Sequence, residues 1–283
     1  MKVLVLGSNG LIGSNIMRVL SGDPSLVVFG TINVNYHPQL ERDFSTRIFR
    51  EVNVLDSSKL FEVFELISPD VVINCVGLTK HKLDAYSISD VIALNAVHPH
   101  RLAEISKIFR SRLIHFSTDC VFLGDKGHYS EVDLPDAVDL YGRSKALGEV
   151  LYGDALTIRA STIGHELGGN HGLLDWFLSQ QLRCKGFRQA VFSGLPTVII
   201  ARVLRDYILR DKTMIGLHHI AANPINKYDL LKLIAKEYGK KIDIEIDDEL
   251  KIDRSLNSSK FNQATGFCCP EWPILIKEMH LFR

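Results

Sequence analysis

A tyrosine and a lysine near the middle of the 283-residue chain could form an acid-base pair. Tyr141 and Lys145 lie four positions apart, so on a helix they project from one face, where an ammonium stabilises an ionised phenol and lowers its pKa. Thr118, after an apolar run, supplies a hydroxyl that can hydrogen-bond a carbonyl and hold it against the phenol. These three predicted catalytic residues could polarise a carbonyl carbon for attack by hydride.

The same spacing occurs a second time, so it needs a structural context before it indicates function. Tyr228 and Lys232 also match it, but they lie in an amphipathic helical pattern in which both are expected to flank a core face. The first copy instead follows a strand-like run, 113–116, that ends in hydroxyl residues. We therefore place the chemistry at the first copy.

A glycine-rich turn stands near the N-terminus, between the apolar run 3–6 and a helical pattern. Glycines let backbone amides approach a pyrophosphate, and a helix N-terminus adds free N–H groups and partial positive charge. The arrangement predicts a dinucleotide site. The residues expected to line it are Gly7, Ser8, Asn9, Gly10, Leu11, Ile12 and Gly13.

The end of the second expected strand, 27–30, bears on the choice of cofactor. Residues 31–33 offer neither a carboxylate for the ribose of NAD nor an arginine for the 2′-phosphate of NADP. Because no carboxylate repels the phosphate, we expect NADP(H), with NAD(H) as the alternative. The other residues expected to contact the cofactor are Asn33, Asp56, Asn74, Val76, Gly77, Asn95, Tyr141 and Lys145.

Strand-like and helical segments alternate through the first 160 residues, which predicts an α/β fold with a doubly wound parallel (Rossmann) sheet. The expected strands are 3–6, 27–30, 48–54, 71–74, 113–116 and 156–159, with helices at 57–67 and 87–109. Beyond residue 161 the alternation fades. We expect residues 1–160, with about 195–222, to form the dinucleotide domain, and 161–194 with 223–283 to form a smaller mixed α/β substrate-binding region.

The composition excludes several classes of function. The 33 basic and 33 acidic residues give zero net charge, so no electrostatic footprint for nucleic acid or an anionic membrane is present. The five cysteines are scattered without a Cys-x-x-Cys spacing, which favours a reduced, cytoplasmic protein. No apolar run reaches the roughly 18 residues of a membrane span. His165 and His171 match no zinc spacing, so we expect no metal site.

Taken in order, the glycine turn, Asn74, Thr118, Tyr141 and Lys145 resemble the extended short-chain dehydrogenase/reductase family, most closely its dTDP-4-dehydrorhamnose reductase group. That group has Ser-Thr-Asp-Tyr-Val-Phe where this chain has Ser-Thr-Asp-Cys-Val-Phe. It also has Tyr-Gly-x-Ser-Lys-x-x-Gly-Glu and Gly-x-Pro-Thr. The matching stretches here are 117–122, 141–149 and 194–197.

The resemblance implies a reductase that passes hydride from NADPH or NADH to the 4-keto group of a nucleotide-activated deoxysugar. In that mechanism Tyr141 protonates the forming alkoxide, Thr118 positions it, and Lys145 binds the nicotinamide ribose while tuning the phenol. The residues expected to contact the substrate are Thr118, Asp119, Cys120, Trp176 and Arg254. Arg254 is expected to meet the diphosphate.

Two departures from the group's pattern favour a sugar other than the rhamnose precursor: Cys120 replaces a tyrosine, and Phe192-Ser193 replaces an acidic-glutamine pair. Related dehydratases usually set an Asp-Glu pair after the threonine, and Cys120 stands in the second place. Two alternative functions are left open. A 4-epimerase uses the same triad, and a regulatory subunit could bind cofactor without turnover. Whether the chain forms a homodimer is also open.

Overall fold

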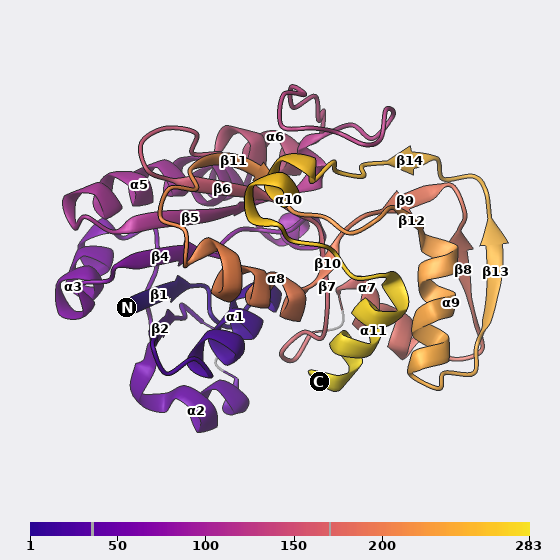
Figure 1. Ribbon diagram of the computed structural model, residues 1–283, viewed down its shortest axis with the longest axis horizontal. Helices are drawn as coiled ribbons and strands as arrows, with labels where there is room; N and C mark the ends of the chain where they lie inside the picture. The colour runs from indigo at the N-terminus through magenta and orange to yellow at the C-terminus, as the bar shows by residue number, and fades with distance from the viewer. Residues whose placement is uncertain (35–36, 170) are drawn as a thin grey trace.

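The computed structural model describes residues 1–34, 37–169 and 171–283. Figure 1 shows a large sheet with helices on both faces on one side of the molecule, and a lobe of short strands and helices on the other. The N-terminus lies at the large sheet and the C-terminal helix packs between the two parts. Most of the large sheet comes first along the chain, and its last strand, β11 (Gly216–His219), follows the first strands of the second lobe.

The large sheet has seven strands in the order β3-β2-β1-β4-β5-β6-β11, and every pairing in it is parallel. Its strands are β1 (Lys2–Leu6), β2 (Val27–Thr31), β3 (Ile48–Phe49), β4 (Val71–Asn74), β5 (Arg112–Ser117), β6 (Leu156–Arg159) and β11 (Gly216–His219). The predicted doubly wound parallel sheet is confirmed. Strand order reverses between β1 and β4, and ligands of such sheets bind outside the carboxyl ends of the strands there.

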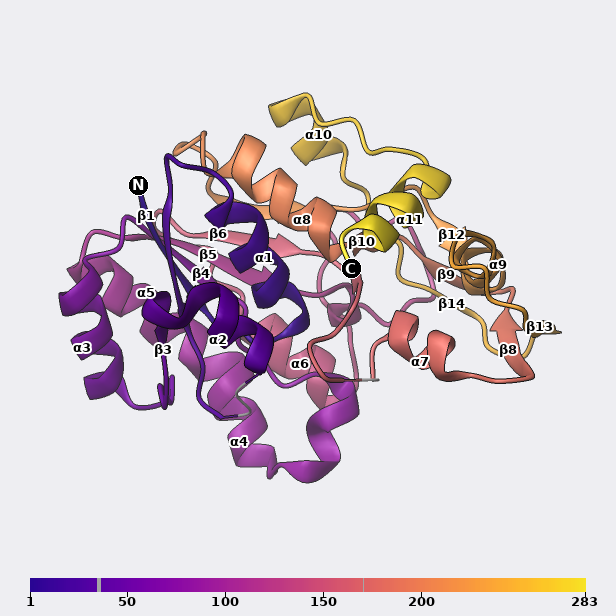
Figure 2. The same ribbon diagram turned by 90° about the horizontal axis from the view of Figure 1, so that it is seen from below.

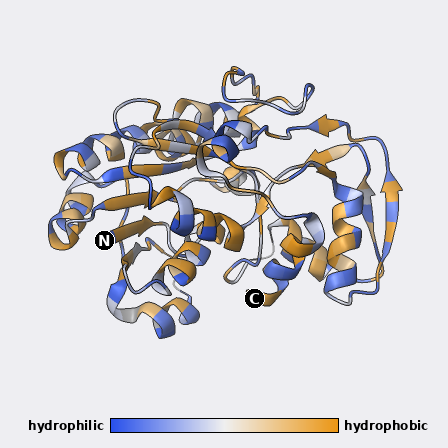
Figure 3. Cartoon of the chain, in the orientation of Figure 1, coloured by the Kyte–Doolittle hydropathy of each residue, from blue (hydrophilic) through white to orange (hydrophobic). Residues whose placement is uncertain are grey.

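Side chains of the strands alternate between two hydrophobic cores, as a period of two requires. Val3 belongs to one core and its neighbour Leu4 to the other. The first core includes residues of α1 (Leu11–Ser21) and α8 (Thr197–Val203), and the second includes residues of α3 (Ser57–Ile67) and α5 (His98–Ile108). Figure 3 shows hydrophobic strands between helices that mix hydrophobic and hydrophilic residues.

The helix predicted at 87–109 changes its winding in the middle. It begins as α4 (Ile88–Ile92), passes through a π-helical turn (Ala93–Val97) and continues as α5. Pro99 has no N–H for the carbonyl of Asn95, four residues earlier, and its ring crowds that carbonyl, which accounts for the wider turn. Figure 2 shows α4 beside α6 (Leu140–Leu147), and the side-chain amide of Asn95 donates to the hydroxyl of Ser144 on α6 at 3.2 Å.

The second lobe is built around three small sheets, β10-β7, β12-β9-β14 and β13-β8. Its strands are β7 (Thr162–Ile163), β8 (Arg183–Phe187), β9 (Ala190–Phe192), β10 (Leu195–Pro196), β12 (Ile225–Asn226), β13 (Asp243–Asp247) and β14 (Ile252–Asp253). Its helices are α7 (Leu173–Ser179) and α9 (Lys227–Glu237), whereas α10 (Ser259–Thr265) packs on β11 of the large sheet and α11 (Trp272–Leu281) packs against both α8 and α9. Because α8 and β11 return to the large sheet, we propose the division 1–160 with 195–222, against 161–194 with 223–283.

The third strand is shorter than the expected 48–54, because its neighbour β2 ends at Thr31. Beyond Phe49 the chain stays close, and the N–H of Val52 donates to the carbonyl of Ile32 at 3.0 Å, but no ladder continues. The short helix α2 (Pro38–Phe44) was not expected. In the described part of the chain, no helix combines the length and the hydropathy that crossing a bilayer requires.

Candidate active site

The glycine turn joins β1 to α1 at the point where the strand order reverses. Gly7 has φ +77°, a left-handed conformation that glycine adopts without strain, and a Cβ on Gly13 would lie 2.2 Å from the carbonyl oxygen of Gly7. Gly10 precedes α1 without a side-chain cap, so the first N–H groups of the helix are open to an anion. These features fit the pyrophosphate of a dinucleotide.

Ser8 and Asn9 hold the shape of this turn. The hydroxyl of Ser8 donates to the carbonyl of Thr31 at 3.0 Å, and a Cβ on Gly30 would come within 2.7 Å of that hydroxyl. The amide of Asn9 donates to the carbonyl of Val34 at 3.0 Å. Both residues therefore tie the turn to the end of β2, and their direct contact with a cofactor stays a prediction.

Two buried amides stabilise the carboxyl edge of the sheet. Asn74 contacts the Nδ1 atom of His115 at 3.1 Å and accepts from the N–H of Val76 at 3.1 Å. Asn95 accepts from the N–H of Leu78 at 2.8 Å and donates to the carbonyl of the same residue at 3.0 Å. Both asparagines are fully buried, so the structure gives them a positioning role.

Asp56, Asn33 and Gly77 are the other predicted cofactor residues, and they differ in exposure and in contacts. Asp56 is exposed and caps α3, accepting from two first-turn N–H groups at 3.0 and 3.2 Å. Asn33 is exposed after β2. A Cβ on Gly77 would lie 3.7 Å from the ammonium of Lys145, so the glycine gives the lysine room. Cofactor contact by these residues stays a prediction.

Close packing brings the helix α6 against the loop after β5. Asp139 caps α6 by accepting from the N–H of Gly142 at 2.9 Å, and a Cβ on Gly142 would stand 2.3 Å from the carbonyl oxygen of Cys120. Only a glycine permits this approach. The approach brings the hydroxyl of Thr118 close enough to the phenol of Tyr141 to lower its pKa, so the structure brings two of the three predicted catalytic groups together.

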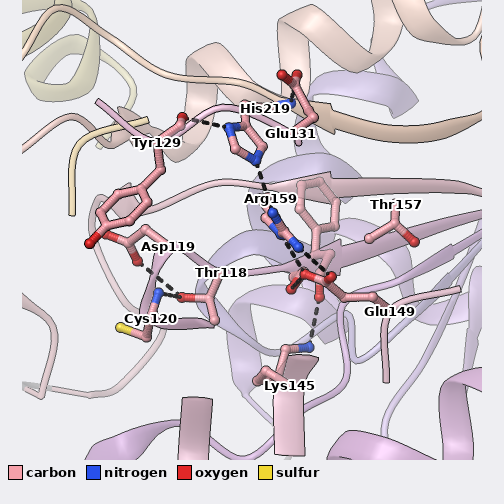
Figure 4. A network of polar contacts seen from close by, with 12 residues as sticks. Thr118, Asp119, Cys120, Tyr129, Glu131, Lys145, Glu149, Thr157, Arg159 and His219 are labelled. Carbon is pink, nitrogen blue, oxygen red and sulfur yellow. Dashed lines mark hydrogen bonds and ion pairs between the residues drawn. The ribbon is translucent and has the colours of Figure 1, made fainter. Parts of the chain in front are cut away.

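Thr118 is also fixed by its neighbours in the loop. Its hydroxyl donates to a carboxylate oxygen of Asp119 at 3.1 Å and accepts from the N–H of Cys120 at 3.1 Å, as Figure 4 shows. Burial raises the pKa of Asp119, and the hydrogen bond from Thr118 acts in the opposite direction. Burial also raises the pKa of the Cys120 thiol to about 12, so this thiol is neutral.

The expectation that Lys145 lowers the pKa of the Tyr141 phenol is wrong. Burial raises that pKa, and the nearby hydroxyl of Thr118 offsets only part of the effect. The ammonium of Lys145 instead donates to the carbonyl of Phe116 at 2.7 Å, and burial lowers its own pKa to about 8. The phenol is therefore protonated at neutral pH and can act as a proton donor.

Two neutral groups lie close to Lys145, and the carboxylate of Glu149 acts on it as a negative charge. Burial raises the pKa of the Cys75 thiol, with the charge of Lys145 opposing it, so this thiol is neutral. Burial lowers the pKa of His115 well below its ordinary value, and the same lysine adds to that effect. Lys145 thus holds a positive charge in surroundings that disfavour it.

A buried ion pair lies behind the catalytic loop (Figure 4). The guanidinium of Arg159 donates to both carboxylate oxygens of Glu149 at 2.7 Å, and the hydroxyl of Ser117 donates to the same carboxylate at 2.7 Å. Arg159 also contacts His219 at 3.3 Å and stacks over the ring of Phe122 at 4.9 Å. The side chains of the pair are 2% and 3% exposed.

This network was missed from the sequence, although a signal was available. Arg159 ends an apolar strand pattern, and a charged residue in a buried strand requires a partner. In the sequence, Glu149 drew attention only as the final residue of the motif at 141–149. The pair joins the end of β6 to the chain after α6, while Ser117 links it to the end of β5.

The predicted substrate residues do not all lie together. Arg254 is anchored beside the catalytic loop, because its Nε donates to the carbonyl of Phe122 at 2.8 Å and its Nη1 lies 3.7 Å from the sulfur of Cys120. Trp176 lies on α7, half-buried against the first core, and its contact with substrate stays a prediction. Lys227, which the sequence did not single out, lies within electrostatic reach of Asp119.

His165 and His171, whose spacing matches no zinc site, have contacts within the protein. His165 contacts the hydroxyl of Tyr238 at 2.9 Å and a carboxylate oxygen of Asp175 at 3.4 Å. The backbone N–H of His171 donates to Glu166 at 2.9 Å. Within residues 1–34, 37–169 and 171–283, no group of three or more His, Cys, Asp or Glu side chains is placed to hold a metal ion.

Comparison with known proteins places the chain in a family. Residues 1–272 match the family model described as the RmlD substrate binding domain. The chain belongs to this family. It is 24% identical to a dTDP-4-dehydrorhamnose reductase of Aggregatibacter actinomycetemcomitans over 253 residues, which cover 83% of this chain and 79% of the relative.

Two further likenesses agree with the family. Over 181 residues the chain is 33% identical to the probable low-salt glycan biosynthesis reductase Agl14 of Haloferax volcanii, covering 62% of this chain and 58% of the relative. Its fold is similar to the solved dTDP-4-dehydrorhamnose reductase of Bacillus anthracis in complex with NADP, with a TM-score of 0.81 and 17% identity. That likeness covers 100% of this chain and 99% of the other, and it shows the fold.

Gly13→Ala should weaken NADPH binding by about tenfold or more and lower the melting temperature, because the added Cβ would meet the carbonyl of Gly7 at 2.2 Å. Fluorescence titration with NADPH and thermal unfolding measure both effects. Gly22→Ala, at the far end of α1, is the matched control, since its Cβ would meet nothing closer than 3.5 Å. Equal behaviour of the two variants would contradict the role given to Gly13.

Arg159→Met should lower the free energy of unfolding by about 3–5 kcal/mol, because it leaves the buried carboxylate of Glu149 without its cation. Urea denaturation measures the loss. The double variant Arg159→Met/Glu149→Gln should lose clearly less than the sum of the two single variants, since both act on one interaction. Simple additivity would show that the pair is not coupled.

Lys145→Met should change the pH dependence of stability. Burial lowers the pKa of Lys145 from its ordinary 10.5 to about 8, so between these values the unfolded chain binds more protons. Wild-type stability relative to the variant should therefore rise by about 2–3 kcal/mol between roughly pH 7 and pH 10. Urea denaturation of both proteins at several pH values tests this. A constant difference would mean that the ammonium is not desolvated.

Proposed function

We propose that the chain is an NAD(P)H-dependent reductase that acts on the 4-keto group of a nucleotide-activated deoxysugar in the synthesis of carbohydrate precursors. The close packing of α6 on the loop after β5, which brings the hydroxyls of Thr118 and Tyr141 near each other at the carboxyl edge of the sheet, is the observation on which the proposal depends. Membership of the RmlD substrate binding domain family and the names of the two relatives support it.

The hydroxyl groups of Thr118 and Tyr141 have different roles at the carbonyl oxygen of the substrate. Thr118, held by its own loop, orients the oxygen, and Tyr141 donates a proton to it as negative charge develops. Because burial raises the pKa of Tyr141, the phenol holds its proton until the oxygen becomes more basic than a ketone. A bound NADPH would supply the hydride. Lys145, which lies beside Gly77, would hold the nicotinamide ribose.

We propose NADP(H) as the cofactor and NAD(H) as the alternative. The glycine turn fits a pyrophosphate, and β2 ends at Thr31 without a carboxylate to repel the 2′-phosphate. The solved fold neighbour from Bacillus anthracis is in complex with NADP, which supports the same choice. A nucleotide sugar is the proposed partner, a cytoplasmic location fits it, and a homodimer stays a prediction.

Purified protein incubated with a panel of nucleotide 4-keto-6-deoxysugars separates the alternatives. A reductase oxidises NADPH or NADH in stoichiometric amounts, an epimerase shows no net consumption, and a regulatory subunit binds cofactor without turnover. Dehydration is disfavoured, because the residue after Asp119 is a neutral thiol and not a second carboxylate. Absence of oxidation with every member of the panel would remove the reductase proposal.

Tyr141→Phe should reduce NADPH oxidation by about a hundredfold or more, because general acid catalysis is lost, while NADPH affinity changes little. Steady-state kinetics and fluorescence titration measure the two quantities. Tyr228→Phe is the matched control: this residue heads the second Tyr-x-x-x-Lys copy, where the ammonium of Lys232 lies 5.2 Å from the ring centre. If Tyr141→Phe turned over as fast as Tyr228→Phe, Tyr141 would have no part in the reaction.

A further inference from the structure

A cavity of about 870 Å³ lies at the amino edge of the large sheet, away from the catalytic loop. Its walls are formed by the starts of β4, β5 and β6, the end of α5 and the segment before β11. Figure 1 marks the N-terminus at this edge of the sheet. From Arg112 at the cavity to Ser117 at the carboxyl edge, β5 spans about 17 Å at roughly 3.3 Å per residue. The volume falls in the range of small-molecule binding sites.

One wall of the cavity contains a buried hydroxyl that has no partner. Ser106 on α5 is 2% exposed, and its hydroxyl makes no hydrogen bond to any residue that the structure describes. The carbonyl of the same residue accepts from the N–H of Ser111 at 2.8 Å, which places Ser106 beside the start of β5. Buried hydroxyl groups in proteins are mostly hydrogen-bonded, and leaving one unpaired is unfavourable. The fold alone does not account for a polar side chain here.

A guanidinium N–H of the same lining also lacks an acceptor. Nη1 of Arg112, the first residue of β5, donates to the carbonyls of Ile208 and Asp211 at 2.8 and 2.9 Å. Nη2 donates to the carbonyl of Met214 at 2.5 Å, but Nε is buried and has no acceptor in the described part of the chain. Because a guanidinium keeps its charge and only donates, this N–H requires an oxygen from another molecule. A single water occupies about 30 Å³, so the cavity is far larger than two bridging waters would need.

Exposed cations surround this lining. Lys107, Arg110 and Lys212 are exposed, and none forms an ion pair with another residue of the described ranges. The carboxylate of Asp70, which also lines the cavity, already accepts from the N–H of Lys2 at 2.7 Å. The charged side chains of the described lining are four cations, Lys107, Arg110, Arg112 and Lys212, and three carboxylates, Asp70, Glu104 and Asp154. Positive charge is in excess, which favours an anion as the ligand.

We propose that this cavity is a second binding site, which takes a small organic anion with an apolar part. A carboxylate or phosphate oxygen would accept from Arg112 and Ser106, and charge-assisted hydrogen bonds are strong in partly buried surroundings. The apolar part would lie on Leu113 and Ala155, which line the cavity and are 3% and 6% exposed. The site is independent of the proposed function, because it shares no residue with the predicted catalytic, cofactor or substrate sets.

Benzoate and phenyl phosphate test the site, because each joins an anionic group to an apolar ring, and benzyl alcohol is the neutral control. Titrations followed by NMR of the alanine methyl groups locate the binding. Either anion should shift the signals of Ala103 and Ala155, which line the cavity, and leave that of Ala137, beside Gly142 of the active site, unchanged. The tighter of the two anions shows whether the site prefers phosphate or carboxylate. No shift of Ala103 and Ala155 with either anion, or an equal shift with benzyl alcohol, would overturn the proposal.

Ser106→Ala removes the unpaired hydroxyl. The affinity for the anions should fall about tenfold, while the melting temperature stays the same or rises, because the hydroxyl has no partner in the described protein. Ser21→Ala is the matched control, since it removes another buried, unpaired hydroxyl from a helix, outside the cavity. This control should bind the anions as the wild type does.

Arg110→Gly tests the exposed cations, with Ser68→Gly as its control. Arg110 and Ser68 stand at or just beyond the ends of α5 and α3 with φ +55° and +49°, a conformation that favours glycine. Both variants should therefore melt at least as high as the wild type. Only Arg110→Gly should bind the anions more weakly, by about three- to fivefold. Wild-type affinity in either Arg110→Gly or Ser106→Ala would mean that the cavity is not the binding site, and the proposal would fail.

Discussion

The buried ion pair of Glu149 and Arg159 is the interaction on which the geometry of the site depends. Taking two charges out of water is unfavourable, and the pair is stable because both carboxylate oxygens accept from the guanidinium while Ser117 and His219 satisfy further positions. It fixes the chain after α6 to the ends of β5 and β6. At the start of α6, the close approach of Gly142 to the carbonyl oxygen of Cys120 fixes the helix to the loop after β5. The phenol of Tyr141, next to Gly142, therefore has little freedom to leave Thr118.

The charges of the site follow from burial. The phenol, the thiols and the imidazole beside Lys145 are all held in their neutral forms, and the lysine is the group whose pKa, about 8, lies near neutrality. A proton can therefore come from the phenol without competition from its neighbours, and the charge that responds to a ligand is that of the lysine. A raised pKa suits the phenol, since a proton donor needs to keep its proton until the carbonyl oxygen becomes basic.

Much of the large sheet could be predicted from the sequence, because buried parallel strands read as short apolar runs and the glycine turn marks the first crossover. β4, β6 and α3 have the expected bounds. The second lobe could not be predicted, because its strands are mostly two to five residues long and pair with segments far away in the chain. In the site, spacing correctly suggested the helix of Tyr141, but the carbonyl that takes the lysine comes from Phe116, on another element. Arg254 and Cys120 lie far apart in the sequence, and only tertiary structure brings the guanidinium within 3.7 Å of the sulfur.

The path of the chain between the two parts has a mechanical consequence. It leaves the large sheet after β6, returns through β10 into α8, and leaves again after β11, so three separate connections join the parts, and α11 packs against both α8 and α9. A single flexible linker would allow the two parts to open widely. Three connections resist rotation of one part against the other, except about an axis that runs near all three. Exchange of products should therefore depend on small sliding motions and local side-chain rearrangement, and new substrate preferences should evolve by replacing side chains rather than by reorienting whole lobes.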